Sequence, residues 1–357
     1  MQKTETPKES KVLLLGNGIY RAFHGEEESW DSVLRFLKKR FERHGLEIKM
    51  DPSQFKSGIL FFEYLYVTWK RFREKNEICF NDDKKTTNET TEWRTFSKKI
   101  QEFLKERYDS DEYTVYSNVI NKMVWSHFDV VLTTNVDNRL ERKMEYGPKD
   151  DDDLPEIDLE NFKQERNRQW KYSTFRRKTN KDGKKIFYMH GSLDKDTSLC
   201  FGLDHYLGEY RCQYDCLYEP KEASSPKKKI LWRLEGEKNS VEHDIDDDYE
   251  NSWLNYFFFH DVDIVGQGLN REELDIWWAL EKRYHYKHLR KMDNVVKSDA
   301  DNRICYFYPS CASDESDAKV ELLRALDVVP VVIPCSTYRE FYKIYFDEFA
   351  GDNTKGG

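Results

Sequence analysis

Short apolar runs without polar alternation recur along the chain, and each is followed by a turn signal or by helical spacing. Such runs are typical of parallel strands that are covered on both faces. They are Lys11 to Leu15, Asp129 to Leu132, Lys185 to Met189, Val262 to Val265, Arg303 to Tyr308 and Val328 to Ile333. Between them, apolar residues recur every three or four positions, as in Trp30, Val33, Leu34 and Leu37, which predicts helices. The alternation predicts an α/β fold with a doubly wound, Rossmann-like parallel sheet.

The alternation is interrupted by three long segments, residues 40–114, 138–184 and 201–250. Segments of this length inside a compact domain usually form lids or binding elements, or are disordered. The first is rich in aromatic residues and has helical spacing, so we expect mostly helical insertions that form a cap or lid. The expected unit is a single domain over residues 10–350, with sheet segments 11–24, 115–137, 185–192 and 260–349.

Composition narrows the class of protein. The 357-residue chain carries a formal net charge of −9, and 15% of its residues are aromatic. Large buried rings offset the entropy lost on ordering, so we expect a folded chain. The negative charge gives no electrostatic reason to bind nucleic acid over the whole surface.

The polar start lacks the apolar core of a signal peptide, and no run approaches the roughly 18 to 20 apolar residues of a membrane span. Seven scattered cysteines suit reduced thiols, so we expect a cytoplasmic protein without membrane contact.

Two glycine turns follow predicted strands, Gly16-Asn17-Gly18 after the first and Gly266-Gln267-Gly268 after the fourth. Glycines at a strand end let the backbone turn tightly and present amides to nucleotide phosphates at the start of a helix. The first turn alone is as typical of a plain strand-to-helix turn, because it does not complete the G-x-G-x-x-G pattern and no Walker lysine is present. One such turn in each half of a doubly wound sheet favours a dinucleotide over a mononucleotide.

Polar residues follow the second and third predicted strands. The second ends in Thr133-Thr134-Asn135-Val136-Asp137, at the strand end where open α/β sheets hold their ligands. One of these side chains could simply cap a helix, but two threonines, an amide and a carboxylate offer more hydrogen-bonding capacity than a cap uses. The third strand leads into His190-Gly191-Ser192. A histidine at a strand end is often a structural hydrogen-bonding group, yet the position also suits a general base.

Taken in order, these four motifs resemble the sirtuin-like family of NAD-consuming domains, especially its bacterial anti-phage branch. That family has a glycine turn after the first strand, a T-[QT]-N-x-D strand end, a catalytic H-G and a late G-x-[GS] turn before a helix. The resemblance spans about residues 10–350 and implies an NAD site at the strand ends. The residues it assigns to NAD binding are Gly16, Asn17, Gly18, Thr134, Asp137, Gly266, Gln267, Gly268 and Asn270, and those it assigns to catalysis are Asn135 and His190.

The resemblance also implies a role for three of these groups. Asp137 fixes the nicotinamide amide, Asn135 holds a water on the ribose, and His190 accepts a proton from that water or from a ribose hydroxyl. Protein deacylases of the family carry a zinc ribbon of two C-x-x-C pairs, which this sequence lacks; Cys212 and Cys216 have no second pair nearby. Water is therefore the expected nucleophile. The expected activity is that of an NAD glycohydrolase, which takes NAD as substrate, uses no metal and releases nicotinamide and ADP-ribose, with cyclisation as a variant.

An ungated NADase would harm its host, so the resemblance implies a gated anti-phage effector. The gate would be homo-oligomerisation or a separately encoded partner, such as an ATPase, a nuclease or a phage-derived trigger. Two other readings stay open, a non-catalytic module that binds NAD or ADP-ribose and signals to a partner, and a protein deacylase. The basic, aromatic segment 166–185 could contact RNA or DNA. A solvated lid explains that segment as well, and we do not expect direct binding of nucleic acid.

Overall fold

The computed structural model describes residues 11–25, 28–55, 57–76, 89–108, 115–141, 163–164, 177–194, 198–217, 252–292, 302–312 and 316–350. Parts of two segments discussed above lie outside the described residues: residues 166–176 of the basic, aromatic segment and residues 218–250 of the third insertion. Within the described part of the chain, no helix is both long enough and apolar enough to cross a membrane.

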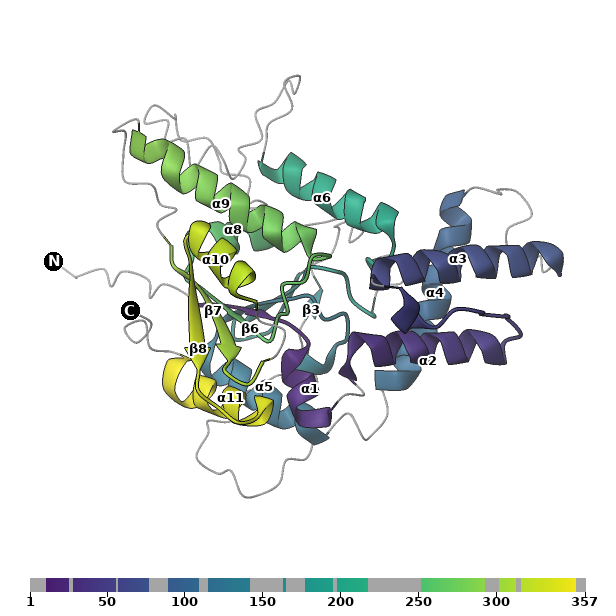
Figure 1. Ribbon diagram of the computed structural model, residues 1–357, viewed down its shortest axis with the longest axis horizontal. Helices are drawn as coiled ribbons and strands as arrows, with labels where there is room; N and C mark the ends of the chain where they lie inside the picture. The colour runs from purple at the N-terminus through teal and green to yellow at the C-terminus, as the bar shows by residue number, and fades with distance from the viewer. Residues whose placement is uncertain are drawn as a thin grey trace.

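A single eight-stranded sheet forms the core of the protein, in the order β3-β4-β5-β2-β1-β6-β7-β8. Its parallel strands are β1 (Val12–Leu15), β2 (Val130–Thr133), β5 (Lys185–Tyr188), β6 (Val262–Val265), β7 (Ile304–Pro309) and β8 (Val328–Ile333). They coincide with the six predicted runs, so the prediction of a doubly wound, Rossmann-like α/β fold is confirmed (Figure 1). Counted in chain order, the parallel strands lie in the order 3-2-1-4-5-6, which places the topological switch point between β1 and β6.

Two strands extend one edge of the sheet and were not predicted from the sequence. β3 (Lys163–Gln164) pairs antiparallel with β4 (Arg177–Thr179), and β4 pairs antiparallel with β5. Both belong to the segment 138–184, whose described residues also include the 3₁₀ turn η4 (Arg139–Glu141). These strands are short and polar, so the open edge of β5, rather than local propensity, provides their hydrogen-bonding partners.

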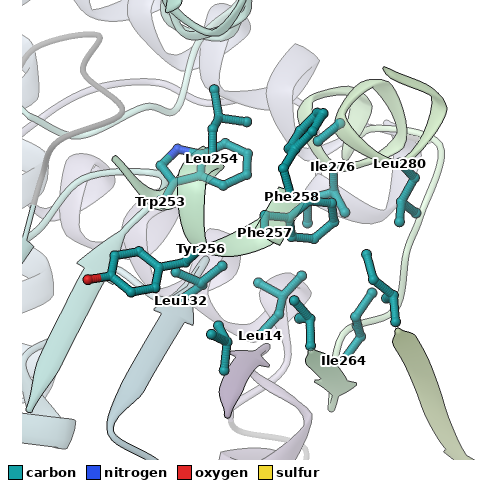
Figure 2. Packing of buried hydrophobic residues seen from close by; sticks show 14 of the residues in the cluster. Leu14, Leu132, Trp253, Leu254, Tyr256, Phe257, Phe258, Ile264, Ile276 and Leu280 are labelled. Carbon is teal, nitrogen blue, oxygen red and sulfur yellow. The ribbon is translucent and has the colours of Figure 1, made fainter. Parts of the chain in front are cut away.

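Apolar side chains of the central strands alternate between two covered faces. On the first face, Leu14, Leu132 and Ile264 lie beneath the aromatic residues of α8 and the apolar residues of α9, as Figure 2 shows. The helices that cover this face are α8 (Trp253–Phe259), α9 (Leu274–Met292) and α10 (Asp317–Ala325).

The second face carries the neighbouring residues of the same strands, such as Leu13, Leu15 and Val131. The elements that cover it are α1 (Gly18–His24), α5 (Val115–His127), α11 (Tyr338–Ile344) and the π-helix η6 (Tyr345–Phe349). Because both faces are buried, the central strands have no polar alternation, which is why the apolar runs were a dependable signal.

A group of helices stands to one side of the sheet and has its own apolar core (Figure 1). Its members are α2 (Trp30–Arg43), the 3₁₀ turn η2 (Pro52–Gln54), α3 (Gly58–Lys75) and α4 (Glu89–Tyr108). The loops that follow β2 and β5 contribute Val136 and Phe201 to this core, and the rings of Phe62 and Phe201 stack with centroids 4.7 Å apart. The helical group is therefore anchored to the loops that carry the predicted catalytic residues. The loop after β5 leads into α6 (Leu203–Leu217), which contacts α3 and α9.

Candidate functional site

The two glycine turns lie against each other at the switch point between β1 and β6. Gly16 donates its amide to the carbonyl of Val265 at 3.1 Å, and Gly18 donates to the carbonyl of Gly266 at 2.9 Å. A Cβ atom on Gly18 would lie 2.7 Å from the hydroxyl of Tyr342, and one on Gly16 would overlap the carbonyl of Gly266. Gly266 has a φ of +66°, a conformation that favours glycine. The glycines are thus required by the contact between the turns, which brings both predicted phosphate-binding segments to one place.

Asn135 lies beside the first glycine turn. The Thr133 hydroxyl donates to the carbonyl of Leu15 at 2.9 Å and accepts the amide of Asn135 at 3.1 Å. The Asn135 side chain then donates from Nδ2 to the carbonyl of Gly16 at 3.3 Å. These bonds join the ends of β1 and β2 and direct the Asn135 side chain toward Gly16 of the first glycine turn. With Nδ2 engaged in this way, Oδ1 is the atom that can accept a hydrogen bond from a water.

Three predicted binding residues are connected through a glutamate that the sequence analysis did not single out. Thr134 Oγ1 donates to Gln267 Oε1 at 3.0 Å, Gln267 Nε2 donates to the carboxylate of Glu273, and the amide of Asn270 donates to Glu273 at 2.7 Å. Burial raises the pKa of Glu273 to about 7, assisted by the charge of Asp275, although the Asn270 amide opposes the shift. Glu273 therefore titrates near neutral pH beside the second glycine turn.

His190 forms a buried pair with Asp275 of α9. Its Nε2 lies 2.9 Å from Asp275 Oδ2, and the two residues are only 7% and 4% exposed. Burial disfavours the charged imidazole, but the charge and hydrogen bond of Asp275 outweigh burial and raise the pKa of His190. Burial likewise opposes ionisation of Asp275, yet His190 and two backbone amides lower its pKa. With Asp275 ionised, Nε2 carries the proton, so Nδ1 is the atom of neutral His190 that can accept one.

The loop after His190 holds its backbone in place. Gly191 has a φ of +88°, and a Cβ atom there would overlap the carbonyl of Ser198. Ser198 Oγ accepts the amide of Ser192 at 2.9 Å and donates to the carbonyl of the same residue at 3.0 Å. The amide of Cys200 donates to the carbonyl of His190 at 3.0 Å. The Tyr206 ring of α6 lies edge-on to the imidazole, with centroids 5.3 Å apart. The histidine is therefore rigidly supported from two sides.

Asp137 lies in a buried ion cluster. Its Oδ1 accepts from Arg139 N at 3.1 Å and Nε at 2.8 Å, and its Oδ2 accepts from Arg139 Nη2 at 3.0 Å. The same guanidinium donates to both oxygens of Glu28, at 2.7 and 3.1 Å, and lies 3.7 Å from the centroid of the Tyr20 ring. Asn17 is tied to the same cluster, because its Nδ2 donates to the carbonyl of Glu28. Two residues predicted to bind NAD thus also hold the strand-end loops together.

The structure therefore links seven of the predicted residues around the switch point, Gly16, Gly18, Thr134, Asn135, Gly266, Gln267 and Asn270, with Glu273 among them. It pairs His190 with Asp275, and Asp137 with Arg139, which also binds Glu28. A sequence signal existed for Asp275, which is an acidic residue enclosed by apolar neighbours in the first turn of a predicted helix. Among the described residues, no group of three or more His, Cys, Asp or Glu side chains is arranged to hold a metal ion. The sequence matches no family model and no curated protein. Function is therefore inferred from the residues of the site and from the order of its motifs.

Proposed function

We propose that this protein is an NAD glycohydrolase that cleaves NAD to nicotinamide and ADP-ribose. The observation that carries the proposal is the buried His190–Asp275 pair, which lies 2.9 Å apart and is linked to a switch point built from two glycine turns. Asp275 shares the start of α9 with Glu273, and Glu273 is bonded to Gln267 of the second turn. A base supported by a carboxylate beside a dinucleotide-type edge is the arrangement that the reaction needs.

Binding is proposed at the edge where β1, β2 and β6 end. In open α/β sheets a dinucleotide lies across the switch point, with its pyrophosphate at the glycine turns. The contact between Gly16 and Gly266 puts both turns within reach of one pyrophosphate. Asn135, bonded to the carbonyl of Gly16, then lies on the side of the adjoining strand β2. This assignment places the nicotinamide ribose toward Asn135 and His190.

The chemistry requires little acid catalysis, because nicotinamide leaves as a neutral group. The bond between the ribose C1′ and the nicotinamide nitrogen breaks, its electron pair leaves with nicotinamide, and the ribose passes through an oxocarbenium-like state. A water held by Asn135 adds to C1′, and its proton passes to Nδ1 of His190. Asp275 keeps the opposite nitrogen protonated and stabilises the imidazolium that forms. A positioned base of this kind contributes about 10² to 10⁴ in rate.

The proposed activity is regulated, and it takes place in the bacterial cytoplasm. An NADase that is always active would deplete its own cell, so we place the activity in the cytoplasm of a bacterium as an anti-phage effector that is inactive until triggered. Homo-oligomerisation or a separately encoded partner would supply the trigger. The support is the order of the four motifs, which resembles the anti-phage branch of sirtuin-like domains. Activity is therefore to be measured over a range of protein concentrations, in which an oligomerisation gate appears as a specific activity that rises with concentration.

One observation favours a second candidate, a module that binds NAD or ADP-ribose without cleaving it. Both oxygens of Asp137 are bonded to Arg139, so the carboxylate assigned to nicotinamide is already engaged. In such a module the ion cluster would shape the binding loops, and a partner would read the bound nucleotide.

The two candidates are separated by product analysis. Purified protein is incubated with NAD, nicotinamide and ADP-ribose are resolved by chromatography, and binding of ADP-ribose is measured in parallel by calorimetry. An NADase releases both products in equal amounts, and Asn135→Ala loses roughly 10² to 10³ in rate. Because Asn135 and His190 act on one water, the double variant is expected to be little slower than the slower single variant. Binding of ADP-ribose with no nicotinamide release at any protein concentration, either alone or together with a separately encoded partner, would favour the module.

A further inference from the structure

Two cysteines lie side by side just beyond the carboxyl ends of β7 and β8. The sulfur atoms of Cys311 and Cys335 are 3.9 Å apart, although the residues are 24 positions apart in the sequence. Cys311 is exposed and Cys335 is partly exposed. Both are thiols in the structure, and a disulfide would need the sulfurs to approach to about 2.05 Å. The remaining gap is small enough for side-chain rotation and a slight movement of one loop to close it.

The pairing register of β7 and β8 determines where Cys311 and Cys335 lie. β7 and β8 are parallel, and Pro309 of β7 is level with Ile333 of β8. Cys311 and Cys335 each follow two residues later, so they leave the sheet together. Ser310 fixes the spacing: its amide donates to the carbonyl of Ile333 at 3.0 Å, and its Oγ accepts the amide of Cys335 at 3.0 Å. The proximity of the sulfurs is thus built into the backbone of both loops.

Two of the other described cysteines, Cys200 and Cys305, are buried. Cys200 is buried, and its thiol donates to Glu209 at 3.1 Å. Cys305 lies on β7 as well but is buried in the sheet, and burial raises its pKa to about 11. A buried, protonated thiol is a poor nucleophile. Exposure and proximity to a second thiol therefore set Cys311 and Cys335 apart from Cys200 and Cys305.

We propose that Cys311 and Cys335 form a redox-active dithiol, which a low-molecular-weight disulfide such as oxidised glutathione converts reversibly into an intramolecular disulfide. In the first step the thiolate of one cysteine attacks a sulfur of oxidised glutathione, whose S–S bond breaks and releases one glutathione as a thiolate. In the second step the other cysteine attacks the mixed disulfide and releases the second glutathione. Two protein thiols are oxidised, one small disulfide is reduced to two thiols, and the two protons from the cysteines pass to the glutathione thiolates.

The pair lies at the same edge of the sheet as the candidate NAD site but includes none of its residues. Cys335 comes just before α11, whose N-cap is Thr337. The hydroxyl of Tyr342 in α11 is the group that a Cβ on Gly18 would meet. Oxidation would therefore tie the segment that leads into α11 to the end of β7. The chemistry of the dithiol does not depend on NAD cleavage, so its test is independent of the proposed function.

The test uses the full chain, reduced and then exposed to oxidised glutathione without air. Slight desolvation, the neighbouring Cys335 thiol and the charge of Glu340 raise the pKa of the exposed Cys311 thiol, so the incubation is run at about pH 8 to supply thiolate. Remaining thiols are blocked with an alkylating agent, and the digested protein is analysed by mass spectrometry. The expected product is a peptide pair that joins Cys311 to Cys335, lacks two hydrogens relative to the dithiol, and disappears after dithiothreitol treatment.

Single variants provide the internal control. In Cys311→Ser and in Cys335→Ser, the remaining cysteine has no resolving thiol, so a glutathione mixed disulfide is expected to accumulate there by at least about tenfold over wild type. Cys305→Ser is expected to leave the link unchanged. Glutathione mixed disulfides on both cysteines of the wild type without the link would overturn the proposal. A link that forms only between two copies of the chain, or no reaction at either cysteine, would overturn it too.

Discussion

Asp275 accepts a hydrogen bond from Nε2 of His190 at 2.9 Å, and the pair joins two parts of the chain that are 85 residues apart. His190 follows β5 in one half of the sheet, whereas Asp275 begins α9 after β6 in the other half. The bond therefore spans the switch point. A carboxylate in this position fixes the tautomer of the imidazole and stabilises its charged form.

The pair predicts a pH dependence of NAD turnover. His190 must be neutral to accept a proton, and Asp275 raises its pKa above the ordinary value of about 6.5. We expect kcat/KM to increase with pH, with a midpoint above about 6.5. In Asp275→Asn the charge is gone and burial dominates, so the midpoint is expected to move to lower pH while the plateau rate falls. Rate profiles from pH 5 to 9 test this expectation, and an unchanged midpoint in Asp275→Asn would contradict it.

The same pair predicts how stability depends on pH. His190 has a raised folded-state pKa, so its contribution is complete below about 6.5 and is lost as pH increases through the raised value. Asp275 has a lowered pKa, so its contribution is present above about 3.9 and is lost as pH falls through the lowered value. Asp275→Asn is therefore expected to reduce the melting temperature most between about pH 4 and 6.5. A reduction of equal size at pH 9 would show that the charge pair is not responsible.

Ionisation of Glu273 is expected to make the folded protein less stable as pH increases, which is the opposite of the effect of Asp275. Its folded-state pKa is raised to about 7. Between about pH 4.5 and 7 the folded protein therefore binds more protons than the unfolded chain, and its stability decreases as pH increases. Glu273→Gln removes this ionisation. The change that it makes to the free energy of unfolding is therefore expected to be more favourable at pH 8 than at pH 5, by at most about 3 kcal/mol. Urea denaturation at the two pH values measures the difference. A variant that is equally destabilised at both would contradict the buried carboxyl.

Arg139 is expected to be essential for folding. Its replacement by Met leaves the carboxylates of Glu28 and Asp137 buried without their cation, which typically costs about 3 to 5 kcal/mol. The matched control is Arg35→Met, whose ion pair with Asp31 lies at the surface and is worth at most about 1 kcal/mol. Asp137→Asn is expected to lose stability as well. An unchanged denaturation midpoint in Asp137→Asn, combined with weaker binding of NAD, would assign Asp137 to the ligand alone.

The strands were predictable because burial on both faces leaves an almost wholly apolar sequence, as in Val12–Leu15 and residues 130–132. β3 and β4 were not, since Lys163–Gln164 and Arg177–Thr179 are polar and become strands only through pairing at the edge of β5. The position of His190 was visible as a strand end followed by glycine. Its partner was not visible, because hydrogen bonds between distant residues depend on the order of strands in the sheet. The contacts of Asp137 could not be predicted for the same reason, because an aspartate close to an arginine in the sequence does not reveal which residues its carboxylate oxygens contact.

His190 is proposed to be the base of an NAD-cleaving site, so the decisive quantity is the rate of nicotinamide release by His190→Ala. The assay uses conditions in which the wild type is active, with ADP-ribose binding and thermal melting as parallel readouts. The control is His285→Ala, because His285 forms a similar pair with Glu281 on α9 but lies at the surface. We expect His190→Ala to lose roughly 10² to 10⁴ in rate and still to bind ADP-ribose, whereas His285→Ala is expected to keep its activity. Near-normal nicotinamide release by folded His190→Ala would contradict this role of His190.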